Sequence, residues 1–151
     1  MQCFLLSRVQ AKASSTSELA QNCNLIVTTT PSITPLLLAK DIQPGTQITA
    51  MGSDTSEKQE LEAEILNKAD IVIADSIPQS KSRGEIYQAV KAGSIDPQKV
   101  VELGHAIQDS KLQRTDNNQI TVVDLTGVAV QDIMITEAVY EAHLQSLNSQ
   151  S

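Results

Sequence analysis

A single carboxylate, Asp54, stands where a predicted strand ends. Residues 46–60 run TQITAMGSDTSEKQE, an apolar alternation followed by a Gly-Ser-Asp turn and an acidic segment. Ligands of open α/β sheets bind beyond the carboxyl ends of the strands. Asp54 is therefore a candidate for chemistry at such an edge. An Asx turn or a helix cap is the alternative explanation of the same pattern.

Two further segments leave predicted strands at the same edge. Residues 28–32 (TTTPS) and 125–127 (LTG) join residues 52–55 (GSDT) there. Together they offer hydroxyls, backbone N–H groups, small residues and one carboxylate, which are the groups of a pocket for a planar polar ligand. β-propensity and capping would explain the same threonines without a ligand.

The other titratable residues carry weaker signals. Asp75 and Asp124 also end predicted strands, where each could cap the following turn. His105 and His143 lie on separate predicted helices without Cys or Asp at ligand spacing, so we expect no metal site. We expect solvated helix faces to account for four charged residues: Lys58, Glu60, Arg83 and Glu85.

Charge and composition exclude several classes of function. The formal net charge of −7 opposes binding to nucleic acid, whose phosphates require clustered Lys and Arg. No apolar run reaches the length of a bilayer span, and residues 1–7 lack the basic start and the length of a signal peptide. Cys3 and Cys23 form neither a metal-ligand spacing nor a disulfide framework. We therefore expect a cytoplasmic protein with no nucleic-acid or membrane partner.

Apolar, β-branched runs predict the strands. Residues 24–29 (NLIVTT) are typical of a strand buried on both faces, so we expect a central position in a parallel sheet. Further strands are predicted at 47–51, 70–74 and 120–124, and residues 9–13 could form a shorter one. Because aromatic residues make up only 2% of the chain, the core must be built from aliphatic side chains.

Helical segments separate these strands. Capping hydroxyls at 14–18 predict a brief helix, Pro35 begins another through Lys40, and a capping box at Ser56 and Gln59 opens a third. Further helices are predicted at 82–91, 97–108 and 130–147. This alternation predicts an α/β fold with a mainly parallel sheet and flanking helices. We predict one domain over residues 9–147 and a polar tail at 148–151.

Six strings of residues, in order along the chain, closely resemble the ornithine cyclodeaminase/μ-crystallin family. They are IVTTTPS (26–32), PGTQITAMGSDT (44–55), KQEL (58–61), RGEI (83–86), VELG (101–104) and DLTGVAVQD (124–132). The similarity runs from about Val9 to His143. It implies a partial Rossmann-like, NAD(P)-binding domain from a group that includes ornithine cyclodeaminase, alanine dehydrogenase, and imine or ketimine reductases.

The resemblance also implies roles for individual residues. Asp54 matches the family's catalytic aspartate, which would manage protons while hydride moves between nicotinamide C4 and the α-carbon of a small amino or imino acid. Seven residues would contact NAD or NADP: Thr29, Thr30 and Pro31 along the cofactor cleft, and Met51, Gly52, Thr126 and Gly127 near the nicotinamide.

The sequence departs from the family pattern in three respects. Its six glycines never adopt a Gly-x-Gly-x-x-Gly or Walker spacing, so the phosphate-binding turn is absent. Also absent is the N-terminal region that in relatives supplies basic residues for the substrate and most dimer contacts. Leu125 stands where ornithine cyclodeaminases carry a serine, which favours the amino-acid dehydrogenase and imine reductase branches.

We therefore expect the C-terminal fragment of an NAD(P)-dependent amino-acid or imine oxidoreductase or cyclodeaminase, inactive by itself. The full-length family forms homodimers, and an uncovered sheet edge would favour self-association of this chain. The alternative is a non-catalytic ligand-binding protein similar to μ-crystallin. Retention of Asp54 argues for enzymatic ancestry.

Overall fold

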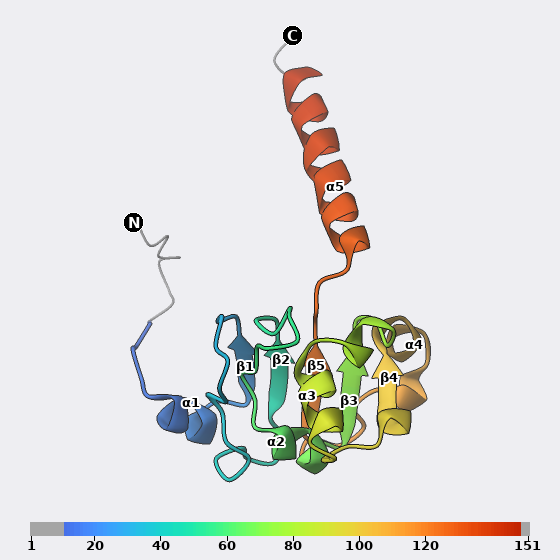
Figure 1. The fold of residues 1–151 in the computed structure, drawn as a ribbon. Coiled ribbons are helices and arrows are strands. Elements are labelled where there is room, and N and C mark those ends of the chain that lie inside the picture. The colour runs from blue at the N-terminus through green and yellow to red at the C-terminus, as the bar shows by residue number, and fades with distance from the viewer. Residues whose placement is uncertain (1–10, 149–151) are drawn as a thin grey trace.

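A computed structural model describes residues 11–148 of the chain. Its centre is a five-stranded sheet in the order β1-β2-β5-β3-β4, and each of these neighbouring pairs is parallel (Figure 1). The predicted α/β class with a mainly parallel sheet is confirmed. The strands are β1 (Leu25–Thr28), β2 (Gln47–Ala50), β3 (Ile71–Ala74), β4 (Val100–Glu102) and β5 (Thr121–Asp124).

Helices separate all consecutive strands except β1 and β2, and α2 (Ala63–Lys68) and α3 (Glu85–Lys91) lie over one face of the sheet (Figure 1). The brief helix predicted after the hydroxyl-rich segment is present, with the Ser15 side chain accepting the N–H of Glu18 at 3.1 Å. The helices are α1 (Thr16–Asn22), α2 (Ala63–Lys68), α3 (Glu85–Lys91), α4 (Leu103–Gln108) and α5 (Ala129–Asn148), with 3-10 turns η1 (Gln79–Lys81), η2 (Pro97–Lys99) and η3 (Ser110–Leu112).

The hydrophobic core is aliphatic, as the composition predicts. Ile48 of β2 and Val122 of β5 are fully buried. Leu61, just before α2, and Ile65 on α2 are fully buried as well. Burial of such side chains is the main favourable contribution to folding. This packing holds the inner strands against α2 and α3 and thereby fixes the positions of the loops that follow the strands.

The helix predicted at 35–40 is absent, and the helix predicted from the capping box at Ser56 begins only at Ala63, as α2. Residues 35–40 and 56–61 instead hold bends and turns and are joined by an isolated parallel bridge between Leu37 and Leu61. The N–H of Leu37 donates to the Glu60 carbonyl at 3.1 Å, and the N–H of Glu62 donates to the Leu37 carbonyl at 3.0 Å. Because these long-range hydrogen bonds hold both segments extended, they override the local capping signals.

The single helix predicted at 97–108 is also wrong. Asp96 does act as a cap, accepting the N–H of Gln98 at 2.9 Å, but the turn that it opens ends with η2. The next three residues pair with β3 as β4. Its two consecutive valines favour a strand over a helix, and α4 begins only afterwards.

β1 lies at the edge of the sheet, so the predicted central position is wrong for the described residues. Only β2 pairs with it there. Ile26 and Thr28 are buried, whereas Leu25 and Val27 on the opposite face are 65% and 56% exposed. An edge strand with open backbone groups and apolar side chains can pair with another polypeptide.

α5 stands away from the sheet, rising beyond the carboxyl ends of the strands (Figure 1). Its large apolar side chains are exposed: Val130, Ile133, Met134, Ile135, Val139, Tyr140, Leu144 and Leu147. At 100° per residue, Ile133 and Tyr140 lie on a different side of the helix from Ile135 and Val139. A helix that is apolar on more than one side is typical of a buried position.

Along residues 11–148, no helix combines the length and the apolar content that a bilayer crossing needs. Two predictions fall partly outside the described residues. These are the strand at 9–13, of which the described part 11–13 has no regular structure, and the polar tail at 148–151, of which Asn148 is the last residue of α5.

Candidate functional site

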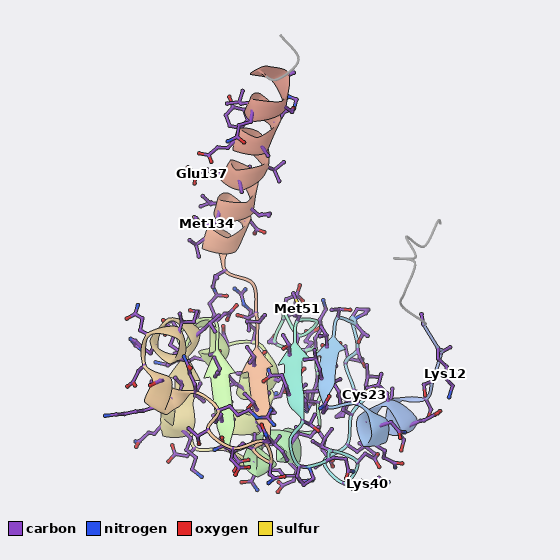
Figure 2. All side chains as sticks on the ribbon, turned by 180° about the vertical axis from the view of Figure 1, so that it is seen from behind. Lys12, Cys23, Lys40, Met51, Met134 and Glu137 are labelled. Atoms are coloured by element: carbon purple, nitrogen blue, oxygen red, sulfur yellow. The ribbon has the colours of Figure 1, made fainter. Side chains whose placement is uncertain are left out.

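Three strand-end loops meet at the carboxyl edge of the sheet, as predicted from the parallel pattern. The N–H of Met51 donates to the Thr28 carbonyl at 2.9 Å, which joins the ends of β2 and β1. The N–H of Leu125 donates to the Ala50 carbonyl at 2.8 Å, which joins the ends of β5 and β2. Met51 marks this edge in Figure 2 and is half exposed.

Asp54 lies exposed in the loop after β2 and pairs with Lys58. The distance from its Oδ1 to the Lys58 Nζ is 2.6 Å. The hydrogen bond from Lys58 holds the pKa of Asp54 below its ordinary value, and the charge of Arg83 acts in the same direction. The carboxylate therefore stays ionised near neutral pH, so that it can stabilise a neighbouring positive charge or accept a proton.

The loop after β1 approaches the loop after β2 very closely. Thr29 and Pro31 are exposed, and Thr30 between them is half-buried. A Cβ atom on Gly52 would lie 2.2 Å from the Thr30 carbonyl oxygen, so only glycine permits this approach. The structure thus brings these four predicted cofactor residues together at one place.

Thr126 and Gly127 follow β5 and are held by Asp75, which follows β3. The Thr126 hydroxyl is hydrogen bonded to the Asp75 Oδ1 at 3.0 Å, and the N–H of Gly127 donates to the Asp75 Oδ2 at 2.9 Å. Thr126 is buried, whereas Gly127 is exposed. Asp75 therefore fixes the adjoining loop rather than capping its own turn.

Glu60 and Glu85 are buried, so the prediction that they lie on solvated helix faces is wrong. Their exposed fractions are 0% and 1%. Burial raises the pKa of Glu85 above its ordinary value, while hydrogen bonds from the Ser53 hydroxyl and from the N–H groups of Glu60 and Leu61 act in the opposite direction. Backbone and hydroxyl donors take the place of water around these carboxylates.

Arg83 and Lys58 also differ from the predicted helix-face residues. Arg83 precedes α3, is partly buried and donates from Nη2 to the Gln79 Oε1. Its Nε atom is buried without a hydrogen-bond partner among the described residues. Lys58 is engaged with Asp54. Both cations therefore lie at the candidate site rather than on a separate surface.

The polar groups at this edge fit the nicotinamide end of a dinucleotide. The two loops meet at Gly52, the Glu60 carboxylate lies against both of them and accepts the N–H groups of Thr30 and Gly52, and the ionised Asp54 follows on the second loop. Carbonyl oxygens, hydroxyls and one exposed charge are typical of sites for planar polar ligands. Within the described part of the chain, no cluster of His, Cys, Asp or Glu is arranged to hold a metal ion.

Prediction from the sequence did not identify Glu60, Glu85 and Asp75 as residues that shape the site. The available signal was their position: Glu60 and Glu85 lie within the strings KQEL and RGEI. Their places in the site depend on contacts with residues far along the chain, such as the N–H of Leu61 that donates to Glu85 and the N–H of Gly127 that donates to Asp75. Local pattern carries no information on such contacts.

Comparison with known proteins agrees with the resemblance seen in the sequence. The ornithine cyclodeaminase/mu-crystallin family model matches residues 5–146. The chain is 43% identical over 126 residues to the alanine dehydrogenase of Archaeoglobus fulgidus, which covers 83% of this chain and 39% of that protein. It is 38% identical over 123 residues to the iminosuccinate reductase of Paracoccus denitrificans, which covers 82% of this chain and 38% of that protein.

Solved structures show the same relation. An archaeal alanine dehydrogenase dimer with bound NAD aligns with a TM-score of 0.83 at 38% identity over 92% of this chain and 43% of that one. The iminosuccinate reductase of Paracoccus denitrificans in complex with NAD+ aligns with a TM-score of 0.82 at 36% identity over 89% of this chain and 41% of that one. These neighbours confirm the Rossmann-like fold. This chain spans about two fifths of the length of its relatives, and it belongs to the ornithine cyclodeaminase/mu-crystallin family.

Proposed function

We propose that the chain provides the nicotinamide side of an NAD(P)-dependent oxidoreductase that acts on a small amino or imino acid. The observation that carries this proposal is that three strand-end loops meet at one edge of the sheet and that one of them carries the ionised carboxylate of Asp54. The relatives named alanine dehydrogenase and iminosuccinate reductase, and the NAD bound in their structures, support it.

In this proposal Asp54 is the catalytic residue. When bound, the nicotinamide exchanges a hydride with the α-carbon of the substrate. The ionised Asp54 stabilises the positive charge of the imine nitrogen and accepts a proton from the amine or from an attacking water. Lys58 lowers the pKa of this carboxylate and holds it by an ion pair.

The cofactor-binding residues in this proposal are those brought together at the carboxyl edge. Thr29, Thr30 and Pro31 line the cleft, and Met51 and Gly52 lie next to the nicotinamide. Thr126 contributes through its loop, since its hydroxyl and the N–H of Gly127 are tied to Asp75. These contacts orient the nicotinamide end only. The glycine-rich phosphate turn does not occur in this sequence.

We also propose that activity requires the polypeptide corresponding to the unmatched three fifths of the relatives, and that the chain acts as a homodimer. The exposed apolar surfaces of α5 and of β1 support both proposals. α5 stands beyond the carboxyl edge of the sheet (Figure 1), so the proposed interface lies on the side of the sheet at which the candidate site is found.

The test replaces the matching region of the Archaeoglobus fulgidus alanine dehydrogenase with this chain and measures NAD-dependent oxidation of alanine. We expect the chimera to turn over and the isolated chain not to. Asp54→Asn in the chimera should lower kcat by about 10² to 10⁴-fold, because the amide neither accepts the proton nor offsets the positive charge.

Glu57→Gln is the matched control, since Glu57 is exposed three residues away and should leave the rate unchanged. An Asp54→Asn chimera as fast as the parent chimera would remove Asp54 from the mechanism. A chimera that binds NADH without any turnover would favour the non-catalytic, μ-crystallin-like alternative. Turnover by the isolated chain would show that the additional polypeptide is not needed.

A further inference from the structure

A buried carboxylate joins two of the loops that form the candidate site. The Glu60 Oε1 accepts the N–H of Thr30 at 2.5 Å, and its Oε2 accepts the N–H of Gly52 at 3.0 Å. Thr30 follows β1 and Gly52 follows β2, while Glu60 itself is fully buried. The Glu60 side chain therefore accepts one backbone N–H from the loop after β1 and one from the loop after β2.

A second buried carboxylate holds the first. The Glu85 Oε1 accepts the N–H of Glu60 at 2.7 Å, and its Oε2 accepts the N–H of Leu61 at 3.0 Å. The Ser53 hydroxyl also donates to the Glu85 Oε1. Glu85 begins α3, so this carboxylate ties the loop that carries Asp54 to a helix packed on the sheet.

Asp54 thus lies between fixed points on its own loop. The N–H of Gly52 is bound by Glu60 and the hydroxyl of Ser53 is bound by Glu85, on the two residues directly before Asp54. Lys58, which pairs with Asp54, lies two residues before Glu60. The loop is therefore held on both sides of the Asp54–Lys58 pair.

We infer that Glu60 and Glu85 are positioning residues: they fix the loop of Asp54 against the loop of Thr30 and so set the geometry of the nicotinamide side of the site. This inference rests on the proposed function for its catalytic meaning. The clamp itself, in which Glu60 and Glu85 accept backbone N–H groups of the loops, can be tested without measuring turnover. Neither carboxylate touches the reacting atoms in this scheme, so each acts through the loop that it holds.

The clamp needs a carboxylate rather than a side chain of the same shape. An ionised carboxylate has acceptor sites on both oxygens, so it can accept one N–H on each. A glutamine has one acceptor oxygen and an NH₂ group, which would face the N–H of Thr30 or of Gly52. Leaving one buried donor unsatisfied is costly enough to displace a loop while the sheet stays folded.

The test is Glu60→Gln, followed by NMR on the 151-residue chain. We expect the amide signals of Thr30 and Gly52 to shift and to lose protection from hydrogen exchange at least about tenfold, in line with the loss of a single buried hydrogen bond. The carboxyl carbon of Asp54 reports on its loop. Its titration midpoint should move up toward the ordinary value as the pairing with Lys58 loosens.

Glu62→Gln is the matched control. Among the described residues its Oε2 accepts one N–H, that of Ala39 at 2.7 Å, so a glutamine can keep this bond with its oxygen. The same substitution two residues away should leave all three signals unchanged. A folded Glu60→Gln chain with unchanged Thr30, Gly52 and Asp54 signals would overturn the inference.

A measurement on the wild-type chain keeps the inference testable if Glu60→Gln does not fold. Scalar couplings across hydrogen bonds should connect the Thr30 and Gly52 amide nitrogens with the Glu60 carboxyl carbon. Their absence in a well-resolved spectrum would overturn the clamp. Because none of these signals depends on turnover, a failure of the alanine dehydrogenase chimera would remove the proposed function and leave this result standing.

Discussion

The carboxyl group of Asp124 lies buried at the end of β5, where its Oδ2 accepts the N–H of Ile86 at 2.9 Å. Burial raises its pKa from 3.8 to about 7, the N–H groups of Ile86 and Glu85 oppose the shift, and the charges of Glu85 and Asp75 add to it. Asp124 thus differs from Asp54, whose pKa is lowered by Lys58. Two aspartates at the same sheet edge are tuned in opposite directions by burial and by an ion pair.

The raised pKa of Asp124 predicts a pH dependence of stability. Between pH 3.8 and about 7, Asp124 is protonated in the folded chain and ionised in the unfolded chain. The favourable contribution of protonated Asp124 to the free energy of unfolding is therefore fully present below pH 3.8 and is lost as the pH rises to about 7. Up to roughly 4 kcal/mol of unfolding free energy is involved, at about 1.4 kcal/mol per pKa unit.

Asp124→Asn should flatten this dependence, because the amide does not ionise and its oxygen can still accept the N–H of Ile86. Urea unfolding followed by far-UV circular dichroism from pH 4.5 to 7.5 measures the slope. Asp132→Asn is the control, since Asp132 is exposed on α5. Identical slopes for wild type and Asp124→Asn would contradict the prediction.

At the scale of elements, the start of α3 is fixed by its packing against the end of β5. Gly84 precedes the helix with a φ of 95°, and a Cβ atom there would lie 2.4 Å from the Asp124 Oδ2 and 2.7 Å from the Thr126 Cγ2. The glycine is thus required both for its backbone conformation and for the close approach of the helix to the strand end. This approach places Glu85, the next residue, under the loop of Asp54.

A pair of glycine substitutions separates the two requirements. Gly93 has a φ of 73°, but a Cβ atom there would meet nothing within 4 Å. Gly93→Ala should cost about 1–2 kcal/mol of unfolding free energy, the strain of a left-handed residue alone. Gly84→Ala should cost at least about 2 kcal/mol more, because the added methyl group collides with Asp124. If Gly84→Ala and Gly93→Ala unfolded at the same urea concentration, α3 would be able to move away from β5 without cost, and the prediction would be wrong.

At the scale of the whole molecule, the chain exposes more surface than a compact protein. Its accessible area is 10244 Å², whereas a compact chain of 16.3 kDa exposes about 7,500 Å² by the usual relation between area and mass. α5 contributes to this excess with exposed apolar side chains on more than one side. The proposed homodimer accounts for this, since two copies of α5 can cover one another.

The corresponding prediction is concentration-dependent association of the isolated chain, measured by sedimentation velocity. Ile133→Glu should raise the dimer dissociation constant at least about tenfold, because a charge would be buried against apolar surface. Gln98→Glu adds the same charge at an exposed position away from α5 and should have no effect. A wild-type chain that stays monomeric at every concentration would contradict the homodimer.

Much of the fold is encoded in local patterns of the sequence. The strands around residues 26, 48, 72 and 122 could be predicted because runs of β-branched residues bounded by turn residues can be recognised without knowing which distant residues they contact. Pro44 and Gly45 are typical of a type II turn, and Gly45 has the positive φ of 84° that such a turn requires. The helix at 35–40 and the early helix start at Ser56 could not be excluded locally, because hydrogen bonds across the molecule hold both segments extended.

The sequence by itself determined the α/β class, the family and the gathering of Asp54, Gly52 and Thr30 at one sheet edge, because parallel strands carry their carboxyl ends to the same side. The tertiary structure alone decided that Glu60 and Glu85 are buried and that β1 is an edge strand. The reason is physical: a carboxylate is buried only where distant N–H groups replace its water, and a strand is central only where a neighbour pairs with it.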